Sequence, residues 1–122
     1  MKLVDSLVEG EYRRELKEGA RYLLEEGGDP KLLALLCREV GAVESVYYLA
    51  GYKLSDYRTY SLLVNGTTVC HIEISNEQIE AFNMISISEY KKGLKKKDQI
   101  KLQVALELSR ACGPRSSPAQ GS

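Results

Sequence analysis

The sequence predicts an α+β fold, in which an N-terminal helical hairpin packs on an antiparallel β-sheet of roughly three to five strands. Helical patterns fill the first third of the chain, and a β-hairpin pattern with Asn65-Gly66 at its tip follows them. The chain has 122 residues, of which 43% are apolar and 28% charged, and this suits one domain with its own core. We expect residues 1–112 to form that domain and residues 113–122, which are poor in apolar side chains, to be disordered.

Two helices are predicted before the sheet. The first begins at a capping-box pattern on Ser6, runs to about Glu26 and carries apolar side chains at helical spacing. The second begins with Asp29 as its N-cap and Pro30 in its first turn, where the missing N–H of proline costs nothing. Its apolar residues lie on more than one side, which predicts a central helix that ends at Gly41.

Two later segments fit either a strand or a helix, and we prefer a strand for both. Residues 42–52 are rich in Val and Tyr, which favour strands. Residues 99–109 alternate apolar and polar side chains, as a half-buried strand does, although they include good helix formers. Between these segments, a second capping-box pattern predicts one or two helical turns over residues 76–82, and residues 83–88 are expected to be extended.

The hairpin pattern also predicts a register. A two-residue type I′ turn at Asn65-Gly66 pairs Val64 with Thr67 and continues in step along both strands. The resulting pairs bring four polar side chains onto one partly solvated face: Arg58, Tyr60, His71 and Glu73. We consider this face a candidate surface for a ligand or an interface.

The motifs of common catalytic, cofactor and metal sites are absent from the sequence. There is no glycine-rich phosphate loop, no GxSxG, no HExxH and no CxxC. His71 is the only histidine, and its neighbour Cys70 must point to the opposite face of the strand, which disfavours a Cys–His dyad. We therefore expect no catalytic residue, no metal site and no cofactor.

The cysteines and the hydropathy indicate a cytoplasmic protein without a membrane segment. Cys37, Cys70 and Cys112 are an odd number of cysteines at wide spacing, so we expect reduced thiols rather than a disulfide framework. No stretch approaches the roughly 18 apolar residues of a membrane helix, and acidic residues interrupt the start of the chain where a secretory signal would lie.

A lysine-rich segment around residue 93 is the strongest local charge feature. The 17 basic and 17 acidic residues of the chain cancel, so any attraction for nucleic acid has to be local. The segment and its flanks comprise Tyr90, Lys91, Lys92, Lys95, Lys96, Lys97 and Lys101. These lysines could contact successive phosphates; alternatively, they form a solvated loop that protects an edge strand from aggregation.

These features favour a non-catalytic binding or assembly module. Tyrosine dominates the aromatic set, with eight Tyr, one Phe and no Trp, and tyrosine suits protein interfaces and base-stacking surfaces. We expect a small self-associating protein, or a subunit of a larger complex, that contacts nucleic acid through the lysines. Two alternatives remain: a cup-shaped ligand-binding or enzymatic domain that uses the polar face of the hairpin, and a regulatory protein-interaction domain without nucleic acid.

Overall fold

Helices cover one end and both faces of a four-stranded antiparallel sheet whose strands follow sequence order. The strands are β1 (Val46–Leu54), β2 (Tyr57–Val64), β3 (Thr68–Ser75) and β4 (Gln78–Ser86). The helices are α1 (Lys2–Leu24), α2 (Pro30–Glu39), α3 (Ile87–Lys91) and α4 (Lys96–Ser116). The computed structural model describes the backbone of residues 2–116 and the side chains of residues 7–111. A helix pair followed by an antiparallel sheet confirms the predicted α+β class.

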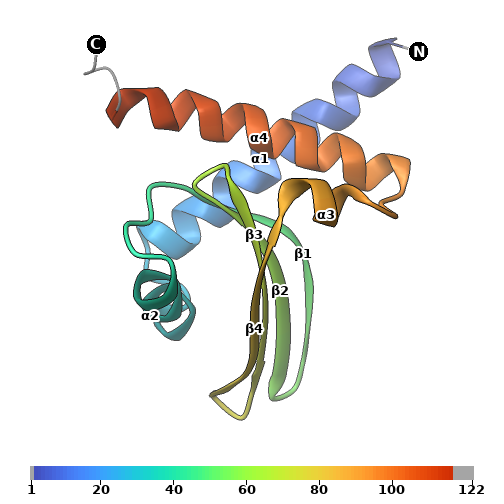
Figure 1. Ribbon diagram of the computed structural model, residues 1–122. Coiled ribbons are helices and arrows are strands. Elements are labelled where there is room, and N and C mark those ends of the chain that lie inside the picture. The colour runs from blue at the N-terminus through green and yellow to red at the C-terminus, as the bar shows by residue number, and fades with distance from the viewer. Residues whose placement is uncertain (1, 117–122) are drawn as a thin grey trace.

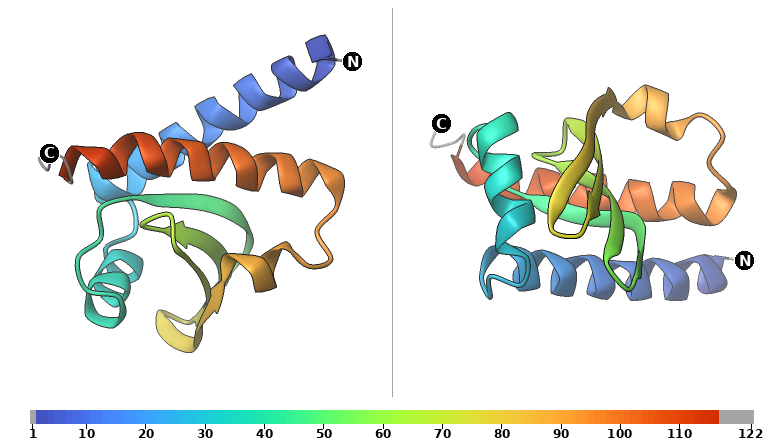
Figure 2. Two further views of the ribbon diagram at one scale, coloured as in Figure 1. Left: turned by 45° about the horizontal axis from the view of Figure 1, so that its top comes forward. Right: turned by 90° about the horizontal axis from the view of Figure 1, so that it is seen from below.

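The two long helices lie across one end of the sheet, and α2 stands beside the strands (Figure 1). α1 and α4 contact each other, as Figure 2 shows, and an exposed ion pair joins Arg13 of α1 to Glu107 of α4 at 3.1 Å. α3 occupies the side of the sheet away from α2. We call the side of the sheet that α2 covers the α2 face, and the side that α4 covers the α4 face.

Apolar side chains form a core on each face of the sheet. The core on the α2 face includes Leu23, Leu32, Leu36, Leu62 and Ile72. The core on the α4 face includes Leu16, Leu63, Val69, Leu102 and Ala105. α1 therefore contributes to both cores, and burial of each large apolar side chain stabilises the fold by about 1.5–3 kcal/mol.

The start of α2 agrees with its sequence pattern, whereas the start of α1 does not. The Asp29 carboxylate accepts a hydrogen bond from the backbone N–H of Leu32 at 3.2 Å, and Pro30 occupies the first turn. Gly41 follows the helix with a φ of 99°, as a C-terminal glycine does. α1 begins at Lys2, so the cap predicted at Ser6 is wrong.

The β2–β3 turn contains one more residue than predicted. Asn65 and Gly66 have φ values of 55° and 69°, and the N–H of Thr67 donates to the carbonyl of Val64 at 3.2 Å, as in a type I′ turn. Thr67 nevertheless stays outside the ladder, so Val64 pairs with Thr68. The predicted register is therefore wrong by one residue along the whole hairpin.

This shift separates the polar residues that were predicted to share a face. Tyr60 pairs with Ile72 instead of His71. Because side chains alternate between the faces, Arg58 and Tyr60 lie on the α2 face while His71 and Glu73 lie on the α4 face. The candidate surface formed by all four residues does not exist.

The side chain of Asn65 ties the same turn to the loop before β1. Its Oδ1 accepts hydrogen bonds from the backbone N–H groups of Glu44 at 2.7 Å and Ser45 at 3.2 Å. Its Nδ2 donates to the carbonyl of Ala42 at 2.8 Å, and its backbone N–H donates to the carbonyl of Ser45 at 2.8 Å. Asn65 therefore sets both the conformation of the turn and its position in the molecule.

The segment predicted as a strand over residues 99–109 belongs to the helix α4. Its buried positions include Leu102, Ala105 and Ser109, which recur at helical spacing and face the sheet and α1. The apolar alternation used for the strand prediction did not include Ala105 and Ser109. The helix propensity of this segment prevails over that alternation. A disordered tail was predicted for residues 113–122, whose side chains are not described. The backbone of α4 continues to Ser116, and residues 117–122 lie outside the described residues.

The helical turns predicted for residues 76–82 are also wrong, because this segment forms the turn into β4 and its first half. Asn76 and Glu77 have φ values of 52° and 64°, and Ser75 pairs with Gln78 across them. Two residues in the left-handed region make a tight hairpin turn and exclude a helix start. The second capping-box pattern therefore marks the turn between β3 and β4 and not the start of a helix.

The remaining strand predictions agree with the structure. β1 confirms the strand preferred for residues 42–52, with its start at Val46. The extended segment predicted over residues 83–88 is confirmed as far as Ser86, whose hydroxyl accepts a hydrogen bond from the N–H of Glu89 at 3.0 Å and begins α3.

Gly66 provides a test of the turn, because a Cβ at this position would lie 2.8 Å from the Cβ of Ser109. We predict that Gly66→Ala lowers the free energy of unfolding by about 2 kcal/mol, since the left-handed conformation alone costs alanine about 1–2 kcal/mol. Gly10→Ala in α1 is the control: nothing lies within 4 Å of the added methyl, so a gain of up to about 1 kcal/mol is expected. Urea denaturation measures both, and an unchanged Gly66→Ala protein would contradict the turn.

Candidate functional site

A row of polar side chains crosses the α4 face where the helical cover of the sheet ends. Leu63 and Val69 are buried beneath α4. In the next row, Ser61 pairs with His71, and His71 pairs with Asn83 on β4. We call Ser61, His71 and Asn83 the polar row.

Hydrogen bonding and an aromatic contact hold the middle of the polar row. Ser61 Oγ lies 2.8 Å from His71 Nδ1, and the tautomer of the imidazole decides which of the two donates. The His71 ring lies 5.8 Å from the ring of Tyr90, so α3 closes one side of the row. Burial, with a smaller contribution from Asp98, raises the pKa of Tyr90 and keeps its hydroxyl protonated. Tyr90 was predicted to belong to the lysine-rich segment, but its ring packs against the polar row.

The polar row forms the floor of a shallow cleft of about 310 Å³, which we call the polar cleft. Its polar and small lining residues are Thr59, Ser61, His71, Glu73, Ala81 and Asn83. Glu73 and Asn83 are exposed, whereas Ser61 and His71 are half-buried. No lysine or arginine lines the cleft. The cleft therefore offers hydroxyl, imidazole and amide groups, with one carboxylate among them.

Sequence reasoning missed Ser61 and Asn83. The two-residue turn placed Ser61 opposite Cys70, on the face away from His71. The structure places Cys70 on the α2 face and His71 on the α4 face, as the alternation of side chains along the strand predicted. Reading Thr67 as part of the turn would have brought Ser61 opposite His71.

A serine bonded to a histidine is also the beginning of a nucleophile–base pair, but the described residues do not complete such a site. In such sites a third group usually orients the base. Among the described residues, Ser61 is the only hydrogen-bond partner of the His71 side chain. β2 and β3 are interior strands, so their backbone N–H groups are engaged in the sheet and are not free to stabilise an oxyanion.

Arg58 and Tyr60, the other two members of the predicted face, join the sheet to α2. The Tyr60 hydroxyl donates to Asp29 Oδ2 at 3.0 Å, and an Arg58 nitrogen lies 3.4 Å from the same oxygen. Arg58 also pairs with Glu77 at 3.1 Å, and its side chain is only 11% exposed. Burial, aided by the Asp29 carboxylate, raises the pKa of Tyr60, so this donor stays protonated. These contacts give both residues a structural role.

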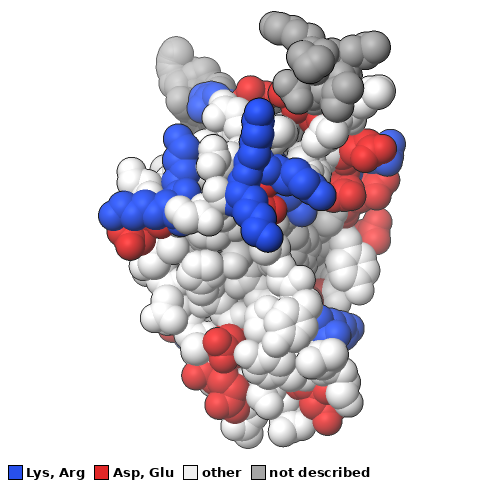
Figure 3. Space-filling model, turned by 90° about the vertical axis from the view of Figure 1, so that its right-hand side faces the viewer, with Lys and Arg blue, Asp and Glu red and all other residues white. Residues whose placement is uncertain are grey.

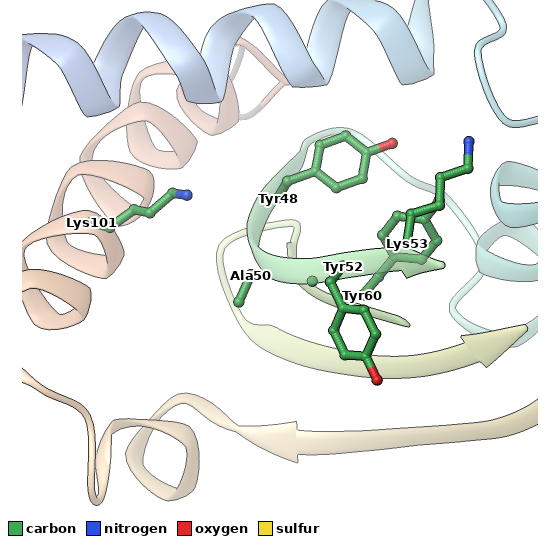
Figure 4. Close-up of a pocket in the computed structure, with 7 residues that line it drawn as sticks. Tyr48, Ala50, Tyr52, Lys53, Tyr60 and Lys101 are labelled. Atoms are coloured by element: carbon green, nitrogen blue, oxygen red, sulfur yellow. The ribbon is translucent and has the colours of Figure 1, made fainter. Parts of the chain in front are cut away.

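A second pocket of about 330 Å³ lies at the free edge of β1, and we call it the edge pocket. Tyr48 and Tyr52 extend to opposite sides of β1, and Lys101 reaches toward the pocket from α4 (Figure 4). Burial is the main reason that the pKa of Tyr48 is raised, and nearby Tyr60 adds to it. Tyr60 lines both the edge pocket and the polar cleft, so the two are adjacent.

Five of the predicted lysines gather at the connection between α3 and α4. These exposed residues, which we call the lysine corner, are Lys91, Lys92, Lys95, Lys96 and Lys97. Figure 3 shows basic side chains in the upper part of this side of the molecule, above a broad area without charge. Lys101 is different: its Nζ lies 3.9 Å from a Glu15 oxygen and 5.7 Å from the centre of the Tyr12 ring. Lys101 therefore binds α1 and is not part of the lysine corner.

Metal binding and membrane spanning find no support among the described residues. The described residues contain no group of three or more His, Cys, Asp or Glu side chains arranged to hold a metal ion. None of the helices in the described part of the chain has the length and apolar character needed to cross a bilayer. Comparison of the chain with protein-family models, with curated proteins and with solved structures finds no match.

The two described cysteines should differ in reactivity. Burial raises the pKa of the Cys70 thiol to about 11, whereas Cys37 is exposed. Because the thiolate is the reactive form, we predict that iodoacetamide at neutral pH modifies Cys37 readily and leaves Cys70 intact until the protein is unfolded in urea. Peptide mass spectrometry distinguishes the sites. Equal labelling of both in the folded protein would contradict the burial of Cys70.

Proposed function

We propose that this protein is a non-catalytic binding module that contacts single-stranded nucleic acid. The lysine corner would contact the phosphates, and the α4 face of the sheet beside it would contact the bases. Two observations support this proposal: basic side chains lie above a broad area without charge (Figure 3), and the exposed Tyr52 pairs with Thr59 and so lies on the α4 face.

The lysine corner has the properties of a phosphate-binding surface. All five lysines are exposed, and Lys92 alone has an ion-pair partner among the described residues, at 3.6 Å from Glu89. The other four can contact phosphate without breaking an existing ion pair, and each contact releases counterions from the nucleic acid. Since the net charge of the chain is zero, attraction acts only near the corner and is screened within about 8 Å at physiological salt.

The aromatic residues favour single strands over duplexes. Tyr52 is 56% exposed, and its ring lies 5.9 Å from the ring of Tyr57 on the same face. Stacking of an unpaired base on an aromatic ring contributes about 1–3 kcal/mol. In a duplex the bases are already stacked on each other and cannot use this surface.

Removing charge from the lysine corner tests the phosphate contacts. For K95A/K96A/K97A, we predict at least about tenfold weaker binding of a single-stranded oligonucleotide at low salt. The slope of log K against log salt is negative, and its magnitude should decrease by about 2, because each of the three lysine contacts contributes about 0.7 for single strands. Fluorescence anisotropy over a salt series measures both quantities.

R14A/K31A/R38A is the matched control, because it removes the same charge from exposed positions on α1 and α2. We expect this control to change affinity by less than about twofold, since screening limits the effect of distant charges. Tyr52→Ala should weaken single-strand binding and leave any duplex binding unchanged. The proposal fails if the wild-type protein does not bind at low salt, or if both charge variants weaken binding equally.

Self-association is a second candidate, and the free edge of the sheet supports it. The outer edge of β1 has no neighbouring strand among the described residues, and Tyr52 and Leu54 on this strand are 56% and 60% exposed. An open edge with apolar side chains can pair with another chain. We predict that the wild-type protein dimerises with rising concentration in sedimentation velocity and that Leu54→Lys stays monomeric. A wild-type protein that is monomeric throughout would remove this candidate.

The proposal includes a reducing, cytoplasmic location. The free thiols of Cys37 and Cys70 support it, because unpaired cysteines suit compartments in which thiols stay reduced.

A further inference from the structure

We infer that the polar cleft binds one unpaired nucleobase that carries an exocyclic amino group, such as cytosine or adenine. The inference rests on the proposed function for the phosphate contacts of the ligand, whereas the base contacts can be tested alone. The polar cleft would then be the part of the α4 face at which a preference for particular bases arises.

The size of the cleft limits the ligand to a single small ring system. Its volume of about 310 Å³ lies at the lower end of the range of about 300–1,000 Å³ for small-molecule sites. The floor is a sheet surface, with the polar row directly across β2, β3 and β4. A planar ring can lie over such a floor and present its edge to the side chains.

The polar groups of the cleft match the edge of a base, which carries donors and acceptors side by side. The Ser61 hydroxyl and the Asn83 amide can each donate and accept hydrogen bonds, and the His71 imidazole has a second ring nitrogen besides the one that contacts Ser61. Asn side chains form paired hydrogen bonds with a ring nitrogen and an adjacent amino group of adenine. Asn83 is exposed on β4, so its amide is free to turn toward a ligand.

Charge excludes phosphate from the cleft and favours an amino group in it. The lining contains the Glu73 carboxylate and no lysine or arginine. An ionised carboxylate only accepts hydrogen bonds, so it pairs with a donor such as an exocyclic amine and repels an anion. A base with a carbonyl in place of that amine would face Glu73 with a second acceptor.

α3 brings the base site and the phosphate site together. Tyr90 touches His71 with a ring separation of 5.8 Å, and the lysine corner begins at the next residue, Lys91. A nucleotide whose base occupies the cleft would have its phosphate on the side of α3, where the lysines stand. One ligand can therefore use both surfaces.

Oligonucleotides of deoxycytidine and deoxyuridine provide the test, because the two pyrimidines have the same shape and differ in two neighbouring groups: C4 carries an amine in cytosine and a carbonyl in uracil, and N3 accepts in cytosine and donates in uracil. We expect the wild-type protein to bind the deoxycytidine oligomer about five- to tenfold more tightly, the effect of one or two hydrogen bonds. Asn83→Ala should erase this ratio and leave deoxyuridine binding unchanged. K95A/K96A/K97A should weaken both and keep the ratio.

Gln78→Ala is the matched control, since it removes the same type of side chain from an exposed position of β4 outside the cleft. It should keep the wild-type ratio. Asn83 is exposed, and circular dichroism verifies that the variant is folded. Ser61→Ala serves as a second variant, with the same expected loss of the ratio.

Cytidine and uridine, which lack phosphate, test the cleft without the lysines. Cytidine should shift the backbone amide NMR signals of Ser61, His71 and Asn83 in the wild-type protein, and the shifts should be absent in Asn83→Ala. If these shifts occur but no oligonucleotide binds, the inference stands for the base and the lysine proposal fails. If oligonucleotide binding depends on the lysines but shows no cytosine preference, or a preference that survives Asn83→Ala, the inference is overturned and the proposed function stands.

Discussion

The side chain of Asn65 holds the β2–β3 turn against the loop that enters β1, and the strands of the sheet are aligned from that point. Hydrogen bonds to Glu44, Ser45 and Ala42 fix one side of the turn, with lengths between 2.7 and 3.2 Å. Gly66 fixes the other side by its close approach to α4. A slip of the hairpin would have to break these contacts together, so the extra residue in the turn is retained.

One residue in this turn decides the chemistry of the α4 face. With Thr67 outside the ladder, Ser61, His71 and Asn83 line up across three strands beside the lysine corner. With Thr67 paired, the hairpin would carry a different set of side chains on each face, because a shift of one residue exchanges the faces. Arg58 illustrates the difference, since it is tied to α2 through Asp29 and is unavailable to a ligand.

The sequence was informative wherever a local interaction determines the structure. Asp29 caps α2 as expected, and the Val- and Tyr-rich segment forms β1. Predictions failed where the outcome depends on distant contacts. α4 buries Ala105 and Ser109, which the apolar alternation of its sequence ignores. The Asn-Gly sequence is compatible with a hairpin loop of two or of three residues. The contacts that Asn65 makes outside the hairpin select the longer loop. The polar cleft depends on that choice and could not be derived from sequence.

The register of the β2–β3 hairpin in solution tests the account most directly. Nuclear Overhauser effects between backbone protons identify the residues that face each other in an antiparallel pair. The account predicts cross-strand contacts that join Ser61 to His71 and Tyr60 to Ile72. Contacts that join Tyr60 to His71 would show a two-residue turn, separate Ser61 from His71 and contradict the polar row.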